Sequence, residues 1–145
     1  MAVLALCGVL AGCHVIGGGS DSATPSASFR CRVKFDSPYR PVVTSAGLIR
    51  GHASALCTQK VDSHVVTLYL ELQSGRSWLI KDRDASEEVP YPKAIGLQVL
   101  EAECQVGTWR LRYNVKATYQ GRAGTAGDGS SFLVIRSDKD CTYAH

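Results

Sequence analysis

The chain lacks several features that would assign it to a familiar functional class. Its single asparagine, Asn114, is followed by Val and Lys, so no N-x-Ser/Thr glycosylation acceptor is present. It contains neither the G-x-S-x-G turn of a serine hydrolase nor the G-K-[ST] ending of a phosphate-binding loop. No two of the last four cysteines lie close together, whereas zinc sites usually take cysteines in close pairs. The sequence therefore favours neither hydrolysis, nucleotide binding nor zinc binding.

Charge is missing from the start of the chain, where the first charged residue is Asp21. Residues 1–12 are apolar or small throughout, but this run is shorter than the roughly 20 apolar residues that a membrane span needs. Its length is typical of the apolar part of an export signal. The basic residues that normally open such a signal are absent, so either the true start lies upstream or the signal is weak.

The segment Leu10-Ala11-Gly12-Cys13 resembles the lipobox of bacterial lipoproteins, in which the cysteine thiol receives a diacylglycerol and a peptidase cuts just before it. The alternatives are an ordinary signal of the A-x-A type or a buried N-terminal helix. We predict a lipoprotein signal peptide at residues 1–12, followed by a lipidated Cys13 and a Gly/Ser-rich flexible tether at residues 13–28. Two acyl chains suffice for stable attachment, which predicts a location on the outer face of the cell membrane.

The six cysteines fit an exported chain. Cys7 would leave with the signal and Cys13 would carry lipid, which leaves an even number for the domain. The remaining four are predicted to form two disulfides: Cys31, Cys57, Cys104 and Cys141. Four cysteines allow three pairings, and the sequence does not select among them; we favour Cys31–Cys57 with Cys104–Cys141, which staples the two halves separately.

Apolar residues alternate with polar ones from Phe29 onward, which is typical of half-buried β-strands. The predicted strands are 29–35, one interrupted near Gly47 or Gly51 within 42–57, 64–72, 77–81, 95–104, 109–119 and 132–135. Loops are predicted at 82–93 and at the Gly-rich stretch 120–131. Trp78 and Trp109 fall on apolar strand faces and are expected in the core. The fold class is therefore all-β: a single Ig-like antiparallel β-sandwich of about seven strands over residues 29–145.

The run Cys104-Gln105-Val106-Gly107-Thr108-Trp109-Arg110, together with the other three domain cysteines, resembles the small secreted Ig-like β-sandwich proteins and lipoproteins of actinobacteria. The resemblance covers about residues 29–143, and its motifs are structural. The family has no settled activity, so it implies a fold and no catalytic residue. Such lipoproteins are also encoded by actinobacterial phages, and some phage lipoproteins block infection by further phages.

Candidate sites for chemistry are sparse. The four histidines at 14, 52, 64 and 145 are scattered, so we predict no enzymatic activity and no cofactor. Residues 82–86 have the D-x-D-x-S opening of a calcium loop, but Glu87 replaces its sharp-turn glycine, so a solvated loop without metal is expected.

Basic residues alternate along two of the predicted strands. If these strands are neighbours, the following residues form a cationic surface patch: Arg30, Arg32, Lys34, Arg110, Arg112 and Lys116. Such a patch could meet an anionic envelope polymer or an acidic protein, although charged outward positions also keep a sheet soluble. The net charge of +3 is too small to indicate nucleic-acid binding.

These observations lead to one preferred function and two alternatives. The preferred one is a monomeric, non-enzymatic binding module, anchored to the membrane by its lipid, whose ligand is a protein or an envelope component. One alternative is a phage- or prophage-encoded lipoprotein that excludes superinfecting phage. The other is a secreted hydrolase inhibitor, since small disulfide-tied β domains suit rigid inhibitory loops.

Overall fold

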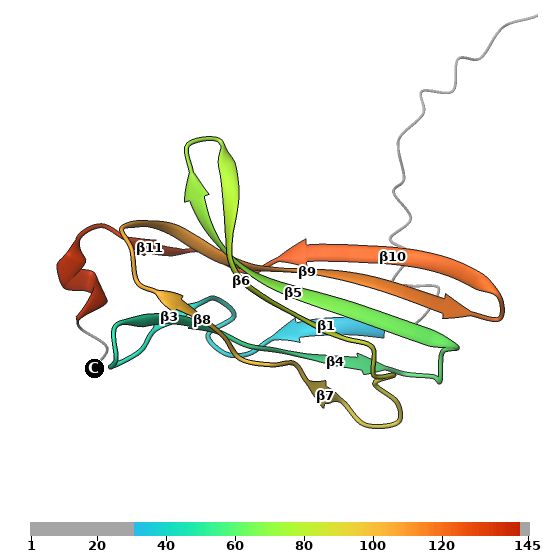
Figure 1. The fold of residues 1–145 in the computed structure, drawn as a ribbon. Coiled ribbons are helices and arrows are strands. Elements are labelled where there is room, and N and C mark those ends of the chain that lie inside the picture. The colour runs from blue at the N-terminus through green and yellow to red at the C-terminus, as the bar shows by residue number, and fades with distance from the viewer. Residues whose placement is uncertain (1–30, 143–145) are drawn as a thin grey trace, which may run out of the picture.

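The computed structural model describes residues 31–142, which form an antiparallel β-sandwich ending in a short 3-10 turn (Figure 1). The elements are β1 (Cys31–Phe35), β2 (Val42–Val43), β3 (Leu48–Gly51), β4 (Ala53–Cys57), β5 (Ser63–Ser74), β6 (Ser77–Ser86), β7 (Ile95–Gly96), β8 (Leu100–Glu103), β9 (Gly107–Tyr119), β10 (Arg122–Gly129), β11 (Leu133–Ile135) and η1 (Asp138–Cys141). The all-β prediction is thus confirmed. The predicted signal peptide, the tether and Cys13 lie outside the described residues.

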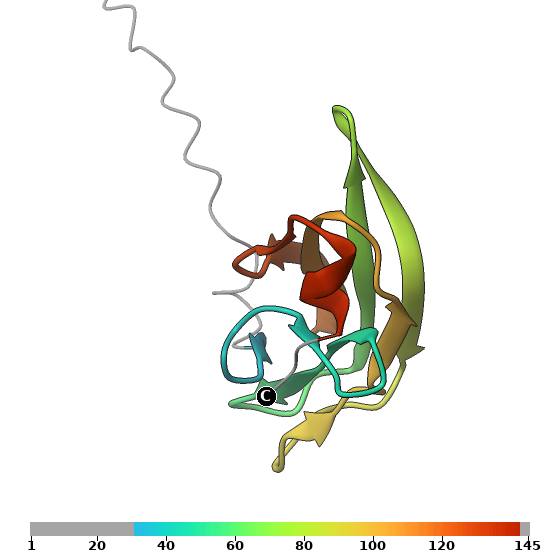
Figure 2. The same ribbon diagram turned by 90° about the vertical axis from the view of Figure 1, so that its left-hand side faces the viewer.

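One long sheet and two short ones make the two layers. The long sheet has the order β10-β9-β5-β6, with β11 also pairing with β9, while the short sheets are β1-β4-β7 and β2-β3-β8. Figure 1 shows the long sheet lying over the short ones, and the turned view in Figure 2 shows the same two layers from the side. The strands number more than the seven predicted because bends divide two of the predicted ones and because β10 forms where a loop was expected.

The predicted strand 95–104 illustrates such a bend. Its first residues form β7 in one short sheet and its last residues form β8 in the other, with Leu97 buried between them. The apolar residues stand at odd positions up to Leu97 and at even positions from Leu100, because the chain crosses from one sheet to the other between them. The interruption expected within 42–57 occurs twice: at Gly47, where φ is +72°, the chain turns between β2 and β3 of one sheet, and at His52 it crosses from β3 to β4 of the other short sheet.

Two segments predicted as loops are strands. Residues 82–86 continue β6, and residues 122–129 form β10, which pairs with β9 from Arg122↔Tyr119 to Gly129↔Arg112. The turn before β10 consists of Gln120 and Gly121, both with positive φ, which is the backbone that a two-residue hairpin of type I′ requires. The residues of β10 did not indicate a strand, because most of them are glycine or alanine, which have low β-propensity.

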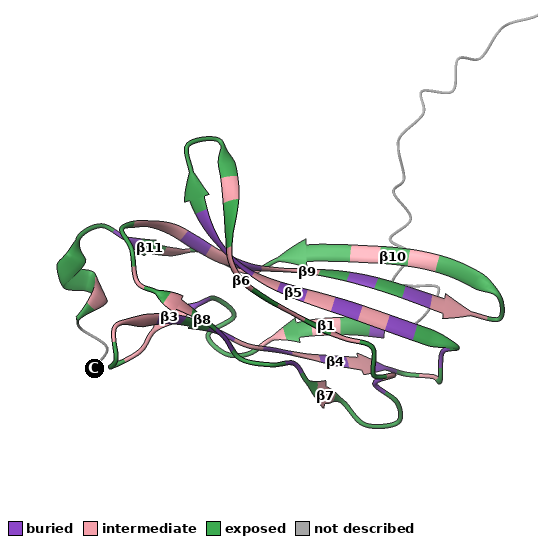
Figure 3. Cartoon of the chain, viewed as in Figure 1, coloured by how far each residue is buried: buried purple, intermediate pink, exposed green. Residues whose placement is uncertain are grey.

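The core lies between the layers and takes residues from both (Figure 3). The long sheet contributes Val66, Leu68, Leu70 and Leu111 at 0–1 % exposure, and Trp109 is fully buried as predicted. The short sheets contribute Ile49, Ala53 and Leu100. Period-two alternation on β5 and β9 produces this arrangement, since every second side chain points to the same face.

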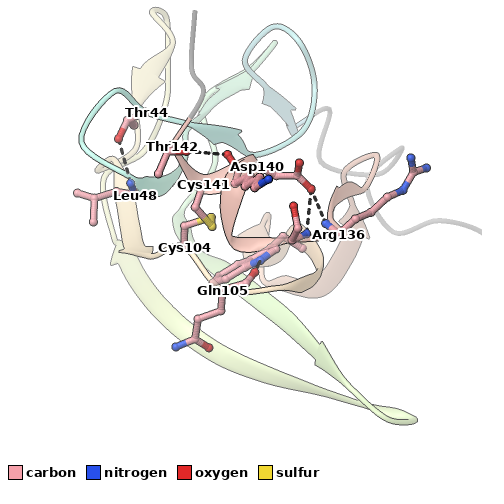
Figure 4. Close-up of a disulfide and its surroundings, with 11 residues drawn as sticks. Thr44, Leu48, Cys104, Gln105, Arg136, Asp140, Cys141 and Thr142 are labelled. Atoms are coloured by element: carbon pink, nitrogen blue, oxygen red, sulfur yellow. Dashed lines mark hydrogen bonds between the residues drawn. A yellow bond between two sulfur atoms is a disulfide. The ribbon is translucent and has the colours of Figure 1, made fainter.

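Two disulfides close the sandwich, and their pairing is the favoured one. Cys31 and Cys57 are direct cross-strand partners on β1 and β4. Cys104 follows β8 and is joined to Cys141 of η1 (Figure 4). Near this second bridge, Asp140 accepts the backbone N–H groups of Arg136 and Ser137 at 2.7 and 3.0 Å, and these bonds lower the pKa of its carboxyl.

No helix within residues 31–142 is long and apolar enough to cross a membrane.

We expect Gly51→Ala to destabilise the fold. Gly51 is buried on β3, and a Cβ there would overlap the side chain of Leu111 from the opposite sheet. Overpacking of this kind costs about 1–3 kcal/mol in the free energy of unfolding. Chemical denaturation measures the loss, and Gly96→Ala is the matched control, because its Cβ would make ordinary contact with His52 at 3.6 Å. Equal stability of the two variants would contradict the packing of the layers.

Candidate functional site

The outer face of the long sheet carries a continuous row of arginine, aromatic and carboxylate side chains. β5 and β9 pair in a register that places Glu71 opposite Arg110 and Tyr69 opposite Arg112. Residues directly opposite each other have their side chains on the same face, so these four side chains meet outside the core. We call the following set the arginine–aromatic row: Tyr69, Arg112, Glu71, Arg110, Trp78 and Phe132.

Glu71 is the centre of the row. Its two carboxylate oxygens accept from Nε of Arg110 at 2.8 Å and from Nε of Arg112 at 2.9 Å. Only 3 % of its surface is exposed, whereas the side chains of the two arginines are 23 % and 29 % exposed. A buried carboxylate needs such partners because an unpaired buried charge is very costly. These three side chains therefore carry one net positive charge, which the two guanidinium groups share.

Each arginine also lies over an aromatic ring. The guanidinium carbon of Arg110 is 3.8 Å from the centroid of the Trp78 ring, and that of Arg112 is 4.1 Å from the Tyr69 ring. Trp78 in turn stacks on Phe132, with ring centroids 5.8 Å apart and an interplanar angle of 20°. Cation–π contacts and stacking hold these planar groups in one orientation.

Exposed apolar side chains adjoin this end of the row. Ile80 lies opposite Glu71 on β6 and is 51 % exposed. Phe132 and Val134, beside β9, are 54 % and 52 % exposed. We call Trp78, Ile80, Arg110, Phe132 and Val134 the tryptophan patch. Apolar side chains gathered at the surface are a mark of contact sites, and here they rest on a rigid sheet.

The hairpin between β5 and β6 extends this surface. Figure 1 shows its tip standing clear of the two layers. Leu79 lies opposite Leu72, on the face that would be core if the sandwich continued, but it is 49 % exposed. The turn itself contains Gly75, whose φ is +60°. The prediction that Trp78 belongs to the core is wrong: its register opposite Gln73 places it on the outer face, where it is half-buried.

The predicted basic patch required two strands to be neighbours, and this condition is not met. β1, with Arg32 and Lys34, belongs to a short sheet, whereas β9 belongs to the long one. Arg110 and Arg112 form ion pairs with Glu71, while Lys116 is exposed on β9. Arg30 lies outside the described residues.

Exposed cations also occur on the layer formed by the short sheets. Arg32 and Lys34 border a shallow hollow of about 530 Å³ on the short sheet β1-β4-β7. Nε of Arg50 donates to Glu101 at 2.6 Å in an exposed ion pair.

The D-x-D-x-S segment at residues 82–86, which was expected to be a solvated loop, is instead part of β6, and its carboxylates accept backbone N–H groups. Oδ2 of Asp82 accepts the N–H of Glu101 at 2.9 Å, and Oδ2 of Asp84 accepts the N–H of Gln98 at 3.3 Å. These bonds join the edge of β6 to the segment that leads into β8. The two aspartates thus cover one edge of the long sheet.

One grouping of possible metal ligands occurs within residues 31–142: Cys31, Cys57 and His64, whose ligand atoms lie within 4.8 Å of one another. The two sulfurs are bonded to each other, and the thiolate form that binds metals is not available in a disulfide. His64 is 1 % exposed, and neither of its ring nitrogens has a hydrogen-bond partner in the described part of the chain. It packs against the disulfide as a neutral side chain.

No protein-family model and no curated protein matches this chain. Among solved structures, the solution structure of R. palustris CsgH is similar, with 7 % identity and a TM-score of 0.38 over 67 % of this chain and 89 % of that one.

We expect Glu71→Ala to destabilise the protein by about 3 kcal/mol, because it leaves two partly buried arginines without their shared partner. Urea denaturation monitored by Trp fluorescence measures the loss. Glu101→Ala is the matched control, since its exposed pair with Arg50 should contribute less than about 1 kcal/mol. A loss at Glu71 no larger than at Glu101 would show that the row contributes little.

His64 should make the fold sensitive to acid. Burial lowers its pKa below the ordinary value near 6.5, and the smaller, opposing effect of the Glu88 backbone does not reverse this. The unfolded state therefore binds a proton more readily, so stability is full above about pH 6.5 and falls as the pH drops towards the lowered pKa.

Unfolding free energies measured between pH 7.5 and 5 should show this loss in the wild type and a shallower slope in His64→Leu. His52→Leu, at a partly exposed histidine beside Asp36, is the matched control and should keep the loss. An unchanged slope in His64→Leu would assign the acid sensitivity to other groups.

Proposed function

We propose that this protein is a non-enzymatic, lipid-anchored binding module at the outer face of the cell membrane, and that it contacts a protein through the tryptophan patch. The patch carries the proposal: exposed apolar side chains surround a tryptophan that is held between Phe132 and Arg110. Trp and Arg are enriched among residues that dominate protein–protein binding. Glu71 neutralises one of the two guanidinium charges, and the exposed side chains around Trp78 are apolar, so an apolar protein surface fits the patch better than an anionic polymer.

The two disulfides support an oxidising compartment. The lipobox-like segment ending at Cys13 supports anchoring on the outer side of the membrane. A rigid, disulfide-tied sandwich that holds most of its contact residues on strands loses little conformational freedom on binding. The proposal therefore combines a fixed location with a preorganised surface.

A second candidate, a secreted hydrolase inhibitor, is favoured by the projecting β5–β6 hairpin, since a rigid protruding turn can fill a cleft. A soluble chain that titrates hydrolase activity stoichiometrically, and loses this on Leu79→Ser, would support it. The phage exclusion lipoprotein is a special case of the first proposal, in which the partner is a phage protein or its receptor; integrase and repressor genes beside the coding sequence would favour it.

The anchor is tested by intact mass and detergent phase partitioning of the chain expressed in an actinobacterial host. We expect the wild type to begin at Cys13, to carry diacylglycerol and to enter the detergent phase. Cys13→Ala should do none of these, and Cys7→Ala, the matched control, should behave as the wild type. An unmodified wild type released into the medium would refute the anchor and bring the inhibitor candidate forward.

The contact surface is tested separately by photo-crosslinking in intact cells. A photoreactive residue in place of Phe132 should capture one defined protein, whereas the same residue at Arg32, exposed on the opposite sheet, should not. Trp78→Ala should weaken binding by about thirtyfold and lower the yield at position 132 accordingly, because hot-spot truncations commonly cost about 2 kcal/mol or more. Equal capture at both positions, or none at 132, would reject the tryptophan patch.

A further inference from the structure

The two edges of the long sheet differ in whether a neighbouring segment bonds to them. At the β6 edge, Asp82 and Asp84 accept backbone N–H groups of the adjoining segment. At the opposite edge, β10 pairs with β9 on one side, and no strand within residues 31–142 pairs with its other side. An exposed strand edge offers a row of unpaired backbone donors and acceptors and is a template for another strand.

The side chains of β10 leave this edge accessible. Between Arg122 and Asp128 the strand reads Ala-Gly-Thr-Ala-Gly, without a bulky, charged or proline residue. Protected edges usually carry lysine, proline or a bulge, and β10 pairs with β9 over eight consecutive residues without a register shift. Residues 123–127 of this edge are therefore free of lysine, proline and bulges, and charged side chains stand only at its two ends, at Arg122 and Asp128.

The charges at the two ends of β10 complement each other. In an antiparallel pair of identical strands with a two-fold axis through Thr125, Arg122 lies opposite Asp128 of the second copy, and Asp128 lies opposite Arg122. Arg122 and Asp128 share one face of the strand, because they are an even number of residues apart. Both are exposed, and neither forms an ion pair with a described residue.

We propose that β10 is a homodimerisation edge, at which two copies of this chain pair antiparallel about Thr125 and join their long sheets into one. The pairing would align residues 122–128 of both strands, form two Arg122–Asp128 pairs and bring the two Thr125 side chains together at the axis. A two-fold axis perpendicular to the sheet keeps the outer faces of both copies on the same side. A monomer was expected from the sequence; the β10 edge leads to a dimer, independently of the proposed ligand.

The register is tested by cysteine cross-linking of the full chain. In Thr125→Cys, the two introduced thiols would lie about 5 Å apart at Cβ across the axis, so mild oxidation should give a covalent dimer on a non-reducing gel. Ala123→Cys is the matched control on the same face of the same strand, where the offset of four residues separates the two thiols by roughly 13 Å. Cross-linking of Thr125→Cys alone supports the register, whereas equal cross-linking of both variants, or of neither, overturns it.

The charge pairing is tested by sedimentation equilibrium of the full chain in detergent. Arg122→Asp and Asp128→Arg should each weaken dimerisation roughly tenfold or more, because two opposite-charge pairs become two like-charge pairs. The double variant restores the complementary pattern and should return the dimer to near wild-type affinity. A wild type that remains monomeric at all concentrations, or a double variant as weak as the single ones, overturns the proposal.

Discussion

The structure depends on the pairing of β5 with β9, which runs from Ser63↔Thr118 to Leu72↔Trp109. One register serves two purposes, because the faces of the paired strands alternate. The inward residues build the core of the long sheet, and the outward ones bring Glu71 to its two arginines. A slip of one residue would bury the arginines and expose the leucines, so the core and the arginine–aromatic row stabilise the same register.

The remaining elements determine which parts of the long sheet are covered and which are left open to partners. β6 and the segment after it seal one edge through Asp82 and Asp84, and the Cys104–Cys141 bridge fixes the C-terminal turn against the end of β8. The hairpin tip and the β10 edge are left outside these restraints. The hairpin tip continues β5, and β10 follows β9 through a two-residue turn. The surfaces available for partners are therefore attached directly to the two central strands.

The sequence predicted the architecture better than it predicted the site. Alternation along 64–72 and 109–119 was strong enough to place β5 and β9, and the four cysteines paired as favoured. β10 was missed because its residues are small and its turn, at Gln120 and Gly121, is not an Asn-Gly or Asp-Gly signal. The basic patch was drawn from strands that belong to different sheets, since alternation shows which residues share a face but not which strands are neighbours. Glu71 was passed over because, in a run of alternating residues, nothing local marks a charge as buried; only the register with β9 does so.

The shared carboxylate also has an evolutionary consequence. Since Glu71 accepts from two arginines at once, losing the glutamate leaves two partly buried cations without their shared partner, and losing either arginine leaves one oxygen of a buried carboxylate without its donor; the three positions should therefore change together among relatives. A glutamate on one long strand and an Arg-x-Arg pair on the next form a signature that depends on three residues and the antiparallel register between them. Diverged relatives could be recognised by this signature when overall identity has fallen too low to align.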